Sequence, residues 1–142
     1  MTFPIWMLLG FAMWTAGVLI FAVGTYRFSR IFTGRAGMAS FPADGSNGAA
    51  WYQRAMRAHA NCVENLPLFT VVVFALYAGG VSSPATDAMS VTALAARVCQ
   101  SLVHIATVQT DRVVTVRFSF FFLQLLCFVG IAGVVLAARA PL

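Results

Sequence analysis

Three polar residues with complementary chemistry lie inside an otherwise apolar stretch of the chain: Arg57, Asn61 and Glu64. Each residue turns a helix by about 100°, so these spacings place all three on one helical face, within an arc of about 60°. An ionisable group at membrane depth is unfavourable by roughly 2.5–3.5 kcal/mol and marks a functional site by default. A guanidinium clamps carboxylates, and a glutamate accepts hydrogen bonds from an ammonium group. The face therefore predicts a site for a small, charged, water-soluble ligand.

A second polar face follows further along the chain. Arg97, Gln100 and His104 are spaced three and four residues apart and also share one side of a helix. With Arg112 or Arg117 at the start of the next apolar segment, they predict a cationic, hydrogen-bonding cavity. A nearby arginine would favour the thiolate form of a bound thiol. An alternative reading is that these groups only hold the helices together, as polar residues do in membrane bundles.

The elements that must position these residues are membrane-spanning helices. The chain of 142 residues is 61% hydrophobic and only 9% charged, whereas a soluble domain carries about 25% charged residues. Since a spanning helix needs about 20 residues, the length predicts an all-α integral membrane protein with four spans. We expect one domain over 1–142, with helices at about 4–26, 49–78, 84–107 and 113–138.

The positions of the arginines predict the topology. They cluster in the loop between the first and second helices and in the loop between the third and fourth. The positive-inside rule then places both of these loops in the cytoplasm and both termini outside it. The lysine-free composition suggests a bacterial inner membrane. The net charge of +5 does not indicate a nucleic-acid partner, because the arginines sit at helix ends and on interior faces. No spacing indicates a metal site.

The segment from Arg57 to Phe69 resembles the signature of a known family, the membrane-associated proteins in eicosanoid and glutathione metabolism (MAPEG). Its arginine, asparagine, glutamate and proline occur at the family's spacings inside a membrane helix. The resemblance implies a left-handed four-helix bundle that assembles as a homotrimer. It also implies that glutathione, as co-substrate, binds between subunits near the cytoplasmic side. The positions that match glutathione contacts of the family are Arg57, Asn61, Glu64 and Arg97.

Two departures from the family pattern bear on catalysis. Gln100 and His104 stand where many members have a histidine and a tyrosine, so His104 is expected to replace the tyrosine hydrogen bond to glutathione. The thiol-activating arginine matches Arg117 by its helix opening and Arg112 by its distance from the third helix; we favour Arg117.

The resemblance implies a membrane-bound, glutathione-dependent transferase or peroxidase that acts on a lipophilic electrophile from the bilayer. A non-catalytic lipid-binding scaffold of the same fold is the first alternative, and a small transport or structural protein is the second. The aromatic run at 118–122 is most simply a packing or lipid-facing surface, and it could also border an apolar substrate groove.

Overall fold

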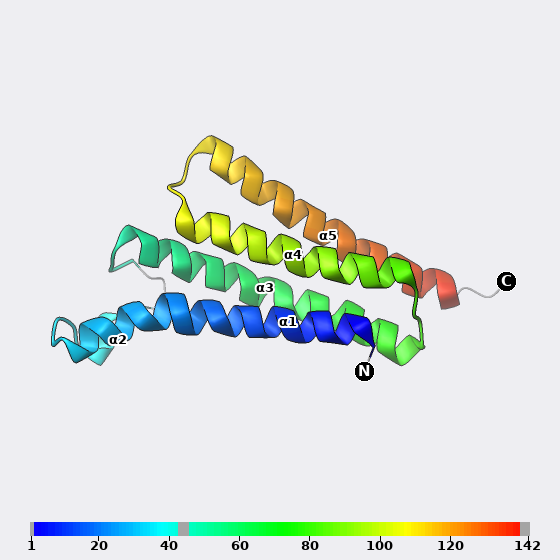
Figure 1. Cartoon of the computed structure of the whole chain (residues 1–142), viewed down its shortest axis with the longest axis horizontal. Helices are drawn as coiled ribbons and strands as arrows, with labels where there is room; N and C mark the ends of the chain where they lie inside the picture. Colours follow the sequence, from blue (N-terminus) through cyan, green and yellow to red (C-terminus); the bar gives the residue numbers. More distant parts are fainter. Residues whose placement is uncertain (1, 43–45, 140–142) are drawn as a thin grey trace.

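The computed structural model describes residues 2–42 and 46–139. Figure 1 shows long helices packed side by side and joined by short loops. Within these described residues, four helices are long and apolar enough to cross a membrane, so the prediction of an all-α membrane bundle is confirmed. The elements are α1 (Phe3–Gly17), a π-helical segment η1 (Val18–Gly24), α2 (Thr25–Phe32), a short 3₁₀ turn η2 (Met38–Ser40), α3 (Ala50–Gly79), α4 (Pro84–Ala106) and α5 (Asp111–Arg139).

The first spanning helix is longer than the sequence pattern predicts. The pattern places its end near residue 26, but α1, η1 and α2 run without interruption to Phe32. Arg27 Nε donates to the hydroxyl of Tyr52 at 2.8 Å, and Arg30 Nη1 donates to the hydroxyl of Tyr26 at 3.0 Å. Cations are also favourable near a helix C-terminus. The arginines therefore accompany the last turns of the helix and do not end it.

The π-helical segment changes which side of the first helix faces the bundle. Buried positions Phe11, Thr15 and Val18 follow α-helical spacing, but the next buried residue is Val23, five positions later, and then Tyr26. A π turn accommodates one extra residue. This shift turns Tyr26 towards α3, where its ring stacks on Tyr52 with centroids 4.2 Å apart.

An apolar core fills the half of the bundle that carries the chain termini. The ring of Phe69 packs against Phe11 at 5.5 Å and against Phe128 at 5.3 Å between centroids. Val73, Leu76 and Ile131 belong to the same buried cluster. Because these residues come from the first helix, α3 and α5, they fix how these helices pack in this half of the bundle.

The other half of the bundle carries the polar faces. In Figure 1 the loops from α2 to α3 and from α4 to α5 lie at one end, and both termini and the α3–α4 loop lie at the other. Arg54 Nε donates to the carbonyl of Ile105 at 3.1 Å, near the end of α4. Cys62 Sγ and Ser101 Oγ lie 3.3 Å apart. These contacts hold the polar face of α3 beside that of α4.

Candidate functional site

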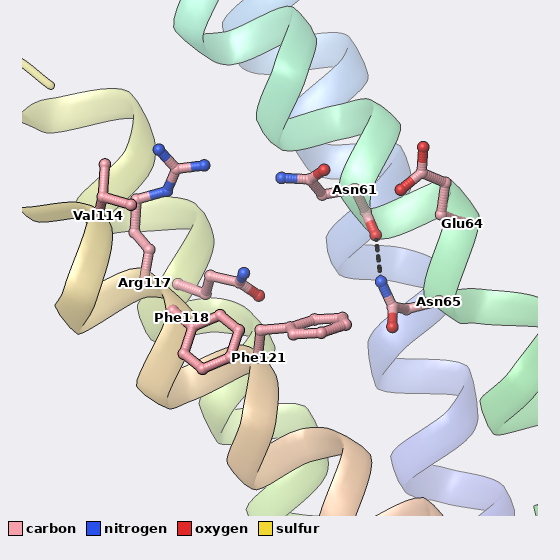
Figure 2. A pocket seen from close by; sticks show the side chains of 8 residues that line it. Asn61, Glu64, Asn65, Val114, Arg117, Phe118 and Phe121 are labelled. Carbon is pink, nitrogen blue, oxygen red and sulfur yellow. Dashed lines mark hydrogen bonds between the residues drawn. The ribbon is translucent and has the colours of Figure 1, made fainter.

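A pocket of about 310 Å³ opens between α3 and α5, with α4 behind it. Figure 2 shows it from close by. One wall is polar and comes from α3, which contributes Asn61, Glu64 and Asn65. The opposite wall comes from α5 and is mostly apolar; it comprises Val114, Arg117, Phe118 and Phe121.

The α3 wall offers hydrogen-bonding groups at two depths. The amide of Asn61 extends towards α5, whereas the carboxylate of Glu64 lies further round the helix (Figure 2). Asn65 is buried, and its Nδ2 donates to the carbonyl oxygen of Asn61 at 2.9 Å. Glu64 is exposed and lines the pocket. Its carboxylate is therefore accessible to a ligand at the rim.

The α5 wall places a cation at the junction of the polar and apolar surfaces. The side chain of Arg117 reaches from α5 into the space between the helices (Figure 2). Its Nε is buried and has no hydrogen-bond partner among the described residues. Phe121 extends its ring towards the α3 side of the pocket (Figure 2). A charged ligand group and an apolar ligand group can therefore meet beside the same guanidinium.

Buried polar atoms without a hydrogen-bond partner among the described residues also lie on α4, at the back of the pocket and just beyond it. Gln100 lines the pocket, and its Oε1 is buried without a hydrogen bond to any described residue. His104, one turn further along α4, has a buried Nδ1 in the same condition. Buried polar atoms in folded proteins are nearly always paired with protein, water or ligand. Those at the pocket wall, Gln100 Oε1 and Arg117 Nε, indicate a place for a polar ligand or ordered water.

The structure thus brings four of the predicted site residues to one pocket: Asn61, Glu64, Gln100 and Arg117. The other four lie outside its lining. Arg57 is exposed on α3, and Arg112 is exposed in the first turn of α5. His104 is buried near the end of α4, beside the starts of α3 and α5, which carry Arg54, Arg57, Arg112 and Arg117. This end of the bundle is therefore strongly cationic.

Arg97 is the predicted site residue that is buried most deeply. Only 1% of its surface is exposed, and its guanidinium lies 5.7 Å from the ring centroid of Phe11. Nη2 donates to Oε1 of Gln124 at 2.6 Å. Gln124 is fully buried, and the sequence interpretation overlooked it. Its signal was available, because it is the only amide side chain in the apolar helix α5.

The comparisons with known proteins place the chain in a family. The model of the MAPEG family matches residues 3–137. The chain belongs to the MAPEG family. No curated protein and no solved structure gives a significant match. MAPEG proteins are four-helix membrane bundles, so this chain is an integral, multi-pass membrane protein. The MAPEG family includes glutathione transferases and peroxidases as well as other members.

Proposed function

We propose that this MAPEG protein is a membrane-bound enzyme that binds glutathione or a similar thiol between α3, α4 and α5. In this proposal, Arg117 stabilises the thiolate, which attacks a lipophilic electrophile that arrives from the bilayer. The observation that supports it best is the position of Arg117 between a polar wall and an apolar wall of one pocket. Such a pocket suits a reaction between a water-soluble anion and a membrane-soluble molecule.

The proposed chemistry needs no nucleophile from the protein. The thiol of glutathione loses its proton to solvent, and the sulfur anion is held beside the guanidinium of Arg117. Its electron pair forms the new bond to the electrophilic carbon, and either a leaving group departs or the electrons move into a conjugated system. Catalysis then consists of positioning and of stabilisation of negative charge.

The charges around the pocket suit glutathione as co-substrate. Glutathione carries two carboxylates and one ammonium group. We assign the carboxylates to the cationic end of the bundle, where Arg57 is the exposed arginine nearest to Asn61 in the sequence, and the ammonium group to Glu64. Arg–carboxylate pairs are short, directional and strong. His104 and Gln100 would supply hydrogen bonds deeper in the site.

We further propose a homotrimer with the ligand between subunits. Glu64 and Arg57 are both exposed on the single protomer. Apolar side chains such as Val63 and Phe118 are exposed near the same rim. A neighbouring subunit would cover this surface and close the site around the ligand.

Calorimetric titration of glutathione into the detergent-purified protein tests this proposal. We expect binding that Glu64→Gln weakens, because the variant removes the charge that faces the ligand ammonium. Asp87→Asn is the matched control, since Asp87 lies in the first turn of α4 at the opposite end of the bundle. Absence of binding up to millimolar glutathione would overturn the proposal and favour the non-catalytic lipid-binding scaffold. Equal losses of glutathione affinity in Glu64→Gln and Asp87→Asn would show that Glu64 is not part of the binding site.

A further inference from the structure

The hydrogen bond between Arg97 and Gln124 joins α4 to α5 in the interior of the bundle. Its length is 2.6 Å, and the two side chains are 1% and 0% exposed. Hydrogen bonds from a charged donor are stronger than neutral ones. Breaking this one would also leave a buried guanidinium without its acceptor, which is strongly unfavourable. The pair therefore has one strongly preferred geometry.

The same pair is related to the pocket by helical spacing. His104 follows Arg97 by seven residues on α4, and Arg117 precedes Gln124 by seven residues on α5. Seven residues are nearly two full turns, so each pair shares one helical face. Because α4 and α5 run antiparallel through a short connection, pairing Arg97 with Gln124 also brings Arg117 level with His104. Consistent with this, Gln100 of α4 and Arg117 of α5 line one pocket.

The register of α4 against α5 therefore decides the composition of the pocket. Gln100 lies one turn from Arg97 towards the pocket, and Phe121 lies one turn from Gln124 in the same direction. A slip by one helical turn moves a residue by about 5.4 Å. Such a slip would separate Arg117 from His104 and Gln100 while leaving α5 apolar enough to pack.

We propose that Arg97 and Gln124 are positioning residues that lock the register of α4 and α5 and thereby place Arg117 in the site. In this role Arg97 does not contact the ligand; it acts through Gln124. The predicted effect on thiol binding rests on the proposed function, whereas the proposal that this pair fixes the register of α4 against α5 does not. Residues that hold a catalytic group in place have large effects, since a displacement of about 1 Å can lower activity by roughly 100-fold.

The first test compares two changes at Gln124 with one at a buried neighbour. Gln124→Leu removes the acceptor, and Gln124→Glu retains one for Arg97. Ile131→Ala is the control, because Ile131 is fully buried on α5 seven residues beyond Gln124. We expect Gln124→Leu to weaken glutathione binding by about tenfold or more. Gln124→Glu should keep the affinity of the parent protein. Ile131→Ala should lower the midpoint of thermal unfolding without this loss of affinity. Equal loss of affinity in Gln124→Leu and Ile131→Ala would overturn the proposal that Arg97 and Gln124 fix the register.

The second test measures the register without any thiol. Nitroxide labels at Val91 and Val116, which are exposed on α4 and α5, would be placed in a background without the native cysteines. The labelled sites are offset by about 20 Å along the bundle axis, at roughly 1.5 Å per residue, so a slip changes their distance directly. We expect one narrow distance distribution in the parent and in Gln124→Glu, and a shifted or broadened one in Gln124→Leu. An unchanged distance distribution in Gln124→Leu would overturn the proposal that this pair fixes the register. If the parent protein binds no glutathione, the proposed function fails. The distance between the two labels then tests by itself whether Arg97 and Gln124 fix the register.

Discussion

Tyr26 and Tyr52 stack with their ring centroids 4.2 Å apart and their planes 20° from parallel. The contact joins the end of the first spanning helix to the beginning of α3. The hydroxyl of Tyr26 accepts from the backbone N–H of Ala49 at 3.0 Å, and the hydroxyl of Tyr52 accepts from Arg27 at 2.8 Å. This pair therefore fixes the helix start from which Arg57 and Asn61 project.

The hydroxyl of Tyr52 should be important for stability. Tyr52→Phe retains the stacked ring but leaves Arg27 Nε without its acceptor. We expect a loss of about 1–3 kcal/mol in the free energy of unfolding, because the donor is charged and partly buried. Thermal unfolding in detergent measures the change. Tyr77→Phe is the matched control at the exposed end of α3, and it should leave the unfolding midpoint unchanged; similar effects of both would refute this role.

The two arginines of α5 should differ in their effect on turnover. Arg117 lines the pocket, whereas Arg112 is exposed in the first turn of the helix. We expect Arg117→Ala to lower kcat by roughly 100-fold or more, as removal of an anion-stabilising donor does, with a smaller effect on thiol affinity. In Arg117→Ala the ultraviolet absorbance of bound thiolate should also disappear. Arg112→Ala should retain both signals, and a larger loss in Arg112→Ala would reverse the assignment.

The apolar wall should select the electrophile. Phe121 lines the pocket, while Phe122 is next to it in the sequence but 49% exposed and outside the lining. We expect Phe121→Leu to lower kcat/KM for planar aromatic electrophiles by about 3- to 10-fold relative to aliphatic ones, because ring contacts contribute about 0.5–1.5 kcal/mol. Parallel assays with one electrophile of each kind measure this ratio. The ratio should be unchanged in Phe122→Leu.

Two glycines of α5 should respond differently to alanine. A Cβ at Gly130 would lie 2.6 Å from Sδ of Met89 on α4, whereas a Cβ at Gly133 would meet nothing within 4 Å. Gly133→Ala should therefore raise the free energy of unfolding by up to about 1 kcal/mol through helix propensity. Gly130→Ala should show a smaller gain or a loss, since Met89 must move. Unfolding midpoints of the two variants decide this, and equal gains would contradict close packing of α4 on α5.

The orientation in the membrane is open to a direct test. Ser40 and Ser82 are exposed in the loops at opposite ends of the bundle. The positive-inside rule predicts that the arginine-rich end faces the cytoplasm. In a background without native cysteines, Ser82→Cys should react with an impermeant maleimide on intact cells, and Ser40→Cys should react only after lysis. The reverse pattern would invert the predicted topology.

Much of the architecture followed from the sequence because its physical cause is local. Long apolar stretches must form spanning helices, since a lipid environment leaves backbone groups no other partners. Periodicity placed Asn61 and Glu64 on one face of α3, and both line the pocket. The predicted end of the first helix is too early because a charged residue need not end a helix: Arg27 donates to Tyr52, and the helix continues to Phe32.

Tertiary structure decided which polar residues meet. Arg97 and Gln100 share one face of α4, and nothing in their spacing distinguishes a buried interior partner from a pocket residue. Only the packing of α5 pairs Arg97 with Gln124 and leaves Gln100 facing the pocket beside Arg117. Helical periodicity fixes directions around one axis, whereas contacts between helices depend on register and crossing, which arise from many side chains packing at once.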